Sequence, residues 1–373
     1  MRGSGTHVLI AASLVSAVLG SVHAFSVFLA PLEQMFGVGR ATVSLTYSLA
    51  LVFLTLTVLA GARIYGRFQP ATIYLVVALL GTAGPLVAGW AAGIWGVWFG
   101  YSLCFGVANG LGYGFGLQYA ARAMPGREGW AMGVVTAAYA LGAAVAPLGF
   151  ERAVALGGFS AAMLGLAGAV LIAGLLAVVM VRRAGVAFQA EDEAVGGALP
   201  GSRLIWLWVG YGAGVAAGLM AIGHAAGIAE LAGKTGWQAP AVLACCNLAG
   251  SLIAGALADR LSMRGLLSVL PMLTALSLIG LVLLTEQTLI FLGLIGFAYG
   301  GTIAAYPAAI GREFGADGPR AYGRVFTAWG TAGLFAPWVA GQIFDWSGGY
   351  APALWLASGL GMVSVVVALR IFR

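Results

Sequence analysis

Charged side chains are scarce in this sequence. Asp, Glu, Lys and Arg make up 8% of its 373 residues, whereas a soluble domain carries about 25%. This scarcity excludes an ordinary water-soluble enzyme, because too few side chains remain to solvate its surface. The hydrophobic share of 61% and the mean hydropathy of +0.98 also exclude intrinsic disorder, since disordered chains are poor in apolar residues.

Cysteine and the common chemical motifs are also lacking. The three cysteines, Cys104, Cys245 and Cys246, fall in apolar runs and give no disulfide framework. The sequence has no metal-cluster spacing, P-loop, nucleophile elbow or dinucleotide fingerprint. We therefore expect no cofactor, no resident metal and no enzymatic activity. The net charge of +6 comes from basic residues scattered in short loops, which favours a membrane-orientation signal over nucleic-acid binding.

Long apolar runs, by contrast, are abundant. A helix needs about 20 mostly apolar residues to cross a bilayer. The runs lie near 7–31, 41–64, 70–92, 94–122, 129–150, 157–181, 203–229, 239–258, 263–284, 288–311, 322–343 and 351–370. The 59 glycines are typical of membrane bundles, where small residues let helices approach closely. The sequence predicts an all-α membrane protein with twelve transmembrane helices.

One polar stretch divides these runs into two groups of six. Residues 182–202 include the acidic run Glu191, Asp192 and Glu193 and read as a cytoplasmic linker. We therefore expect an N-terminal six-helix bundle at 1–181 and a C-terminal six-helix bundle at 203–373. With both termini in the cytoplasm, only Arg40, Lys234 and Arg152 of the 18 basic residues fall on the outer side. This bias predicts that orientation, in a bacterial inner membrane.

The two halves resemble each other in sequence. The segment from Gly133 to Pro147 matches the segment from Gly323 to Pro337, 190 positions later. At the same offset Gly106, Gly110, Arg122 and Tyr139 fall on Gly296, Gly300, Arg312 and Trp329. Parallel repeats joined by a linker are typical of transporters whose substrate site lies between the halves.

These features resemble those of the major facilitator superfamily over essentially the whole chain. The sequence GALADR at Gly255–Arg260, followed by SMRG, resembles its loop motif between helices 8 and 9. Three stretches, His23–Gly37, Asn109–Ala143 and Ala217–Ala229, look like the oxalate/formate antiporter and monocarboxylate transporter group. The resemblance implies a monomeric carrier that works by alternating access. It also implies that Arg63, Arg67, Asp259, Arg260 and Arg264 tune its conformational states from the cytoplasmic loops.

The chain departs from that group where basic residues are expected. The matching positions hold Ser251 in helix 8 and Trp329 in helix 11, and Asn247 takes the place of a neighbouring acidic residue. The absence of both cations disfavours a dicarboxylate as substrate. No Asp, Glu, Lys or Arg has to lie at mid-depth, where a charge is costly.

Two histidines are the titratable groups expected at depth. His23 and His224 lie on helices 1 and 7, which occupy equivalent positions in the two halves and line the cavity in the resembled family. Histidine changes charge near neutral pH and donates to carboxylates. We therefore predict both as substrate-binding and proton-coupling candidates, with packing as the competing interpretation.

Polar and aromatic residues in mid-run complete the predicted site. Mid-run placement favours a cavity lining over the aromatic belts of membrane interfaces. The further substrate-binding candidates are Asn109, Tyr113, Tyr139, Met220, Asn247, Ser251, Tyr299, Thr302, Tyr306 and Trp329.

The leading hypothesis is a secondary transporter for a monocarboxylate or related weak organic acid, with a proton as partner. A competing hypothesis is a copper importer, because Met220 and His224 share a helix face, Cys245 and Cys246 lie in the next helix, and Met, His and Cys are soft-metal ligands. A carrier of a neutral or amphiphilic solute is a third hypothesis. A non-transporting membrane receptor or assembly factor is a hypothesis of a different class.

Overall fold

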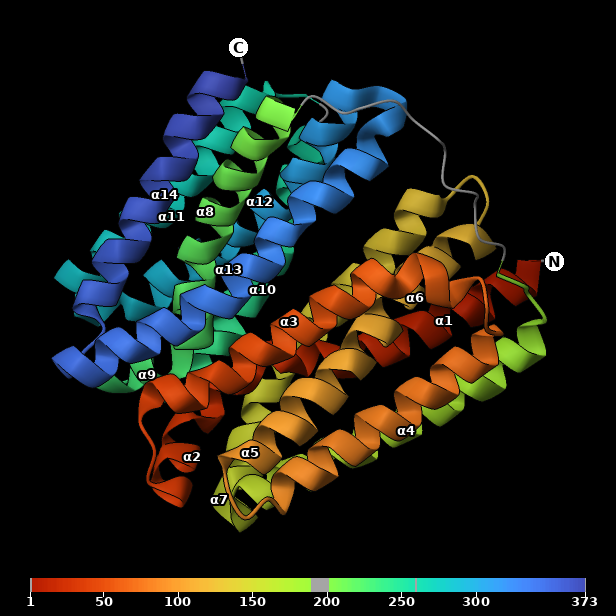
Figure 1. The fold of residues 1–373 in the computed structure, drawn as a ribbon, viewed down its shortest axis with the longest axis horizontal. Helices are drawn as coiled ribbons and strands as arrows, with labels where there is room; N and C mark the ends of the chain where they lie inside the picture. The colour runs from red at the N-terminus through yellow and green to blue at the C-terminus, as the bar shows by residue number, and fades with distance from the viewer. Residues whose placement is uncertain (1, 189–200, 259, 373) are drawn as a thin grey trace. The chain divides into compact units, whose positions relative to one another are not determined.

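All regular structure in the described residues is helical (Figure 1). The computed structural model describes residues 2–188, 201–258 and 260–372. Most of the predicted linker at 182–202 therefore lies outside the described residues, and so does Asp259.

The helices follow one another with short connections. Those of the first half are α1 (Arg2–Leu19), α2 (Leu29–Phe36), α3 (Arg40–Tyr65), α4 (Pro70–Gly89), α5 (Ile94–Val97), α6 (Gly106–Ala123) and α7 (Glu128–Ala184). Those of the second half are α8 (Gly201–Gly223), α9 (Ala225–Leu231), α10 (Gln238–Ala258), α11 (Met263–Leu283), α12 (Thr288–Phe314), α13 (Gly318–Ser347) and α14 (Ala351–Ile371).

These helices account for the twelve predicted membrane spans. In the described part of the chain, 9 helical segments are long and apolar enough to cross a membrane. One of them, α7, holds two spans, because its backbone leaves the helical region at Gly157 and Gly158, where Gly158 has φ 71°. The helical stretch at 94–123 and α13, with 30 residues, supply the rest.

Three spans contain irregular turns that the apolar runs do not predict. The first span has a 3-10 segment at Gly20–Phe28 between α1 and α2. The fourth has a π-helical segment at Trp98–Phe105 between α5 and α6. The seventh breaks at His224, whose φ of −123° separates α8 from α9. Such mid-helix irregularities often mark functional positions, and two of them contain the candidate histidines His23 and His224.

The chain forms two compact units. Unit 1 comprises Met1–Gly37 and Leu49–Glu193, and unit 2 comprises Val38–Ser48 and Ala194–Arg373. Within unit 1, α7 packs against α1 and α4. Within unit 2, α10 packs against α12, and α14 packs against both α8 and α11 (Figure 1). The first residues of α3 therefore belong to the C-terminal unit, and the remainder of α3 belongs to the N-terminal unit.

Repeat-matched glycines bring helices together in the same way within each unit. In unit 1, Gly106 and Gly110 of α6 lie against backbone carbonyls of α3. In unit 2, Gly296 and Gly300 of α12 lie against backbone carbonyls of α10. A Cβ at any of the four would overlap a carbonyl oxygen, so the close approach requires glycine. The sequence repeat therefore corresponds to a repeated packing contact.

Candidate functional site

The N-terminal unit contains a buried hydrogen-bonded pair between α6 and α7. The Tyr139 hydroxyl donates to Asn109 Oδ1 at 3.1 Å. The Asn109 amide donates in turn to the backbone carbonyl of Leu19 at 2.7 Å, where α1 passes into its 3-10 segment. Asn109 is fully buried and Tyr139 is 8% exposed. Three elements are thus joined at the point where the first span loses its α-helical geometry.

His23 and Tyr113 flank this pair from two sides. The His23 ring meets the Tyr139 ring edge-on with centroids 5.7 Å apart, and the Tyr113 ring lies 4.4 Å from Tyr139. The Tyr113 hydroxyl lies 3.4 Å from Thr136 Oγ1. His23, Tyr113 and Thr136 are each partly exposed. We call these five residues the N-terminal polar cluster: His23, Asn109, Tyr113, Thr136 and Tyr139.

The sequence predicted four of the five members of this cluster. Thr136 was missed, because a threonine in an apolar helix gives no signal of its own. It could have been found from its spacing, since Thr136 and Tyr139 are three positions apart and share a helix face. The cluster contains hydrogen-bonding groups and one imidazole, and none of its members carries a fixed charge.

The C-terminal unit has a matching pair at the repeat offset. The Trp329 indole N–H of α13 donates to the Tyr299 hydroxyl of α12 at 2.8 Å. Tyr299 and Trp329 lie 190 positions after Asn109 and Tyr139, so the same two helix positions are hydrogen-bonded in both units. Trp329 also stacks on Phe326, with centroids 5.5 Å apart and planes 5° apart. The structure therefore joins these two predicted residues within unit 2.

The other predicted residues of unit 2 are divided between packing and partly exposed positions. Thr302 bonds to its own helix at the Ala298 carbonyl, Tyr306 packs on Tyr211, and Met220 is 2% exposed. Asn247 and Ser251 are partly exposed on α10 beside Gly300. Met220, Thr302 and Tyr306 are buried, and their substrate-binding role stays a prediction.

His224 is fully buried and both of its ring nitrogens have partners. Nε2 lies 2.7 Å from the Pro337 carbonyl of α13, and Nδ1 lies 3.2 Å from the Tyr350 hydroxyl. A metal needs a free imidazole lone pair, so the copper hypothesis gains no support from this geometry. Among the residues that the structure describes, no three His, Cys, Asp or Glu side chains gather as a metal would require.

Arg40 is a buried cation that the sequence did not predict. It is 8% exposed in unit 2, and its Nη1 donates to the Tyr350 hydroxyl at 2.6 Å. The sequence placed Arg40 in an outer loop, because it directly precedes an apolar run. No local pattern links it to Asp345 or Tyr350, which lie more than 300 positions away.

The predicted loop residues lie at helix ends. Arg63 is in the last turn of α3, and Arg67, Arg260 and Arg264 are exposed in or beside short turns. Asp259 lies outside the described residues, so the predicted contacts of this loop motif remain a prediction.

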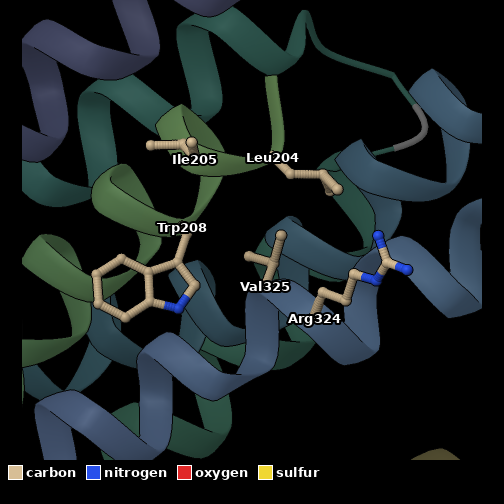
Figure 2. Close-up of a pocket in the computed structure, with 5 residues that line it drawn as sticks. All are labelled: Leu204, Ile205, Trp208, Arg324 and Val325. Atoms are coloured by element: carbon tan, nitrogen blue, oxygen red, sulfur yellow. The ribbon is translucent and has the colours of Figure 1, made fainter. Parts of the chain in front are cut away.

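A shallow pocket lies elsewhere in unit 2, between α8 and α13 (Figure 2). It has a volume of about 180 Å³ and is lined by Leu204, Ile205, Trp208, Arg324 and Val325. The Trp208 indole donates to Thr327 Oγ1 at 2.9 Å. None of the predicted site residues lines this pocket.

Comparison with known proteins identifies the fold. Residues 9–293 match the family model described as Major Facilitator Superfamily. The uncharacterised transporter YhjX of Escherichia coli strain K12, described as MFS-type, is 21% identical over 343 residues, which cover 87% of this chain and 85% of YhjX. These matches do not test the resemblance to the oxalate/formate and monocarboxylate group, which stays a prediction.

Solved structures of the E. coli xylose transporter XylE share the architecture. The partially occluded inward-open form matches with a TM-score of 0.73 and 12% identity, covering 97% of this chain and 98% of XylE. The inward-open form matches with a TM-score of 0.71 over 98% of this chain and 95% of XylE. At this identity the likeness shows the fold alone and carries no information on the solute.

Proposed function

Because this chain belongs to the Major Facilitator Superfamily of transporters, we propose that it carries a small weak organic acid across a membrane by alternating access. The favoured solute is a monocarboxylate or a related monoacid that moves together with a proton. The observation that supports this proposal is the N-terminal polar cluster, which combines hydroxyl and amide groups with one imidazole and no fixed charge.

The chemistry of this cluster suits a single carboxylate better than two. Burying an unpaired carboxylate costs several kcal/mol, unless donors and a counter-charge replace its hydration. A protonated His23 would supply one charge and the neighbouring hydroxyls would supply hydrogen bonds. A monoacid and a proton then enter as a net neutral pair. A dianion would need a second cation, and the positions where the resembled group has cations hold Ser251 and Trp329.

The orientation in the membrane and the oligomeric state are part of the same proposal. We propose that the protein is a monomer in a bacterial inner membrane with both termini in the cytoplasm. The clustering of basic residues on one side of the predicted spans supports this orientation.

Ligand-induced thermal stabilisation of the purified protein tests the substrate class. We expect short monocarboxylates at mildly acidic pH to raise the melting temperature by several degrees, since a ligand at about 100 times Kd contributes ~2.7 kcal/mol. Dicarboxylates, neutral sugars and Cu(I) should give no shift. His23→Gln should lose the response, because a glutamine cannot carry the proton.

Tyr101→Phe is the matched control for this measurement. Tyr101 is fully buried outside the cluster, so its variant should keep the monocarboxylate response. Stabilisation by a neutral solute or by Cu(I), with none by monocarboxylates, would overturn the proposed substrate class.

A further inference from the structure

A continuous chain of hydrogen bonds joins three helices and the start of a fourth within unit 2. Arg40 Nη1 of α3 donates to the Tyr350 hydroxyl at 2.6 Å. Tyr350, which directly precedes α14, contacts His224 Nδ1 at 3.2 Å. His224 Nε2 lies 2.7 Å from the Pro337 carbonyl of α13. We call Arg40, His224, Tyr350 and the nearby Asp345 the α3 latch.

The partners of His224 fix which nitrogen carries the hydrogen. A carbonyl oxygen can only accept, so Nε2 must donate to Pro337. In the neutral ring, Nδ1 then has a lone pair and accepts from the Tyr350 hydroxyl. The Tyr350 oxygen accepts from Arg40 in turn. Every hydrogen in this chain therefore points the same way, from Arg40 through Tyr350 to His224 and Pro337.

A second contact holds the first turn of α3 without involving His224. The Asp345 carboxylate accepts from the backbone N–H groups of Arg40 at 2.8 Å and Ala41 at 2.9 Å. A helix leaves its first N–H groups without internal partners, and a carboxylate there also opposes the positive end of the helix dipole. Asp345 of α13 thus caps α3 from another helix.

Two glycines leave room for the latch. A Cβ on Gly227 would lie 2.6 Å from the Tyr350 hydroxyl and 2.9 Å from Arg40 Nη1. A Cβ on Gly39 would lie 2.7 Å from the Asp345 carboxylate. Both close approaches are too short for a methyl group, so side chains at these positions would separate the latch groups.

Three of the four latch side chains are buried. His224 is fully buried, Tyr350 is 5% exposed and Arg40 is 8% exposed. The Arg40 guanidinium also lies 4.1 Å from the Phe344 ring centroid. The charged groups that act on His224 are Arg40 from α3 and Asp345 from α13. Tyr350 faces it from the start of α14, Tyr47 of α3 lies beside Gly223, and Glu230 at the end of α9 is exposed.

We propose that the α3 latch is a proton-operated switch, in which neutral His224 holds the start of α3 to the C-terminal unit and protonated His224 releases it. A proton added at Nδ1 would turn His224 from an acceptor into a donor. Arg40 and His224 would then both donate to the Tyr350 oxygen, and the Tyr350 hydroxyl hydrogen would lose Nδ1 as its acceptor. A second buried cation would also be formed beside Arg40. Both effects weaken this series of hydrogen bonds, whereas the Asp345 cap does not involve His224 and is kept.

This switch goes beyond the proposed transport function and needs no substrate. Residues 38–48 belong to unit 2, whereas α3 continues into unit 1 from Leu49. The state of His224 therefore determines how firmly one end of this shared helix is held by the C-terminal unit. The latch is closed at high pH and opens as the pH falls through the titration of His224.

Amide hydrogen exchange of peptides covering residues 38–48 tests the switch in the substrate-free protein. Exchange is compared at about pH 7.5 and about pH 4, because burying a cation opposes its formation and the lower pH has to lie below the usual histidine range. The rates are corrected for the intrinsic pH dependence of exchange. We expect the wild-type rate to rise by about fivefold at the lower pH, as for the loss of one or two hydrogen bonds. Peptides from α11 serve as the internal reference.

Four variants separate the causes. His224→Gln cannot titrate and should abolish the pH response. Gly227→Ala and Tyr350→Phe keep His224 but interrupt the series of hydrogen bonds from Arg40 to Pro337. The amides of residues 38–48 should therefore exchange fast at both pH values in these two variants. Asp345→Asn removes the carboxylate that caps α3. The amides of this variant should exchange faster at about pH 7.5 and should still exchange faster again at the lower pH.

Two results would overturn the proposal. One is an unchanged pH response in His224→Gln; the other is a response lost in Asp345→Asn but kept in His224→Gln. If His224→Gln does not fold, as judged by the α11 reference peptides, Gly227→Ala and Tyr350→Phe decide the question. A wild-type-like pH response in these two variants would equally contradict a switch that works through Tyr350.

Discussion

Two hydrogen-bonded aromatic pairs occupy corresponding positions in the two halves of the chain. Tyr139 donates to Asn109 and Trp329 donates to Tyr299, and each donor lies 30 positions after its acceptor. The chemical groups of the two pairs differ. A phenol donates to an amide in the first half, whereas an indole donates to a phenol in the second half. The helix positions of the hydrogen-bonded pair are thus repeated in the two units, while the chemical groups at those positions differ.

Removing the Tyr139 hydroxyl should destabilise the protein and weaken solute binding. Tyr139→Phe leaves the buried Asn109 Oδ1 without this donor, which costs about 1–3 kcal/mol. We expect a lower melting temperature and weaker monocarboxylate stabilisation in thermal-shift measurements. The control is Tyr101→Phe, because the Tyr101 hydroxyl is buried and makes no hydrogen bond within the described residues. This control should be neutral or stabilising, and equal losses in both variants would contradict a specific role for Tyr139.

The sequence predicted residues that belong to repeated patterns and missed those that pair across long distances. Tyr139 and Trp329 were found because they share an offset of 190. Arg40 was missed because its partners Asp345 and Tyr350 lie more than 300 positions away. His224 was predicted as a candidate, but the hydrogen-bond partners of its two ring nitrogens were not. Only the folded chain shows which nitrogens are occupied.

At the scale of helices, glycine sets the distance between neighbours. In α12, Gly300 lies against the backbone of Asn247 in α10. A Cβ added to Gly300 would lie 2.7 Å from Ser251 Oγ. In α13, Gly323 has open space where a Cβ would be. The two glycines come from the same repeated half, but only one of them is required by a close helix contact.

Substitution of these two glycines should therefore have opposite effects. Gly300→Ala forces α12 away from α10 and should cost about 1–3 kcal/mol by overpacking. Gly323→Ala should be neutral, or stabilising by up to about 1 kcal/mol, because alanine favours the helix. Thermal unfolding in detergent measures both. A stable Gly300→Ala variant would show that α10 and α12 can separate without cost.

The predicted spans were correct as apolar runs but not as regular helices. Composition and length predict where a helix crosses the membrane, since each run needs only enough apolar residues. They do not predict the 3-10 segment at Gly20–Phe28 or the break at His224. These irregularities depend on contacts with other helices, such as the approach of Gly20 to the Tyr139 backbone and of Gly223 to Pro337.

For the whole molecule, scarce charge and abundant apolar runs were enough to predict the architecture. Only 8% of the residues are charged, so they could be assigned to loops and helix ends. The family match over residues 9–293 agrees with the predicted fold. In the proposed function, the solute is recognised by a few partly exposed groups, such as His23 and Tyr113. Their chemistry limits the substrate class, and their positions come only from the fold.

The central claim is that the protein moves a monoacid together with a proton. Its most direct test is uptake of a radiolabelled monocarboxylate into proteoliposomes with an inwardly directed proton gradient, compared with protein-free vesicles to subtract passive permeation. The account predicts protein-dependent accumulation that collapses when a protonophore removes the gradient, that is lost in His23→Gln and that is retained in Tyr101→Phe. The claim would be contradicted if proteoliposomes took up each monocarboxylate no faster than protein-free vesicles.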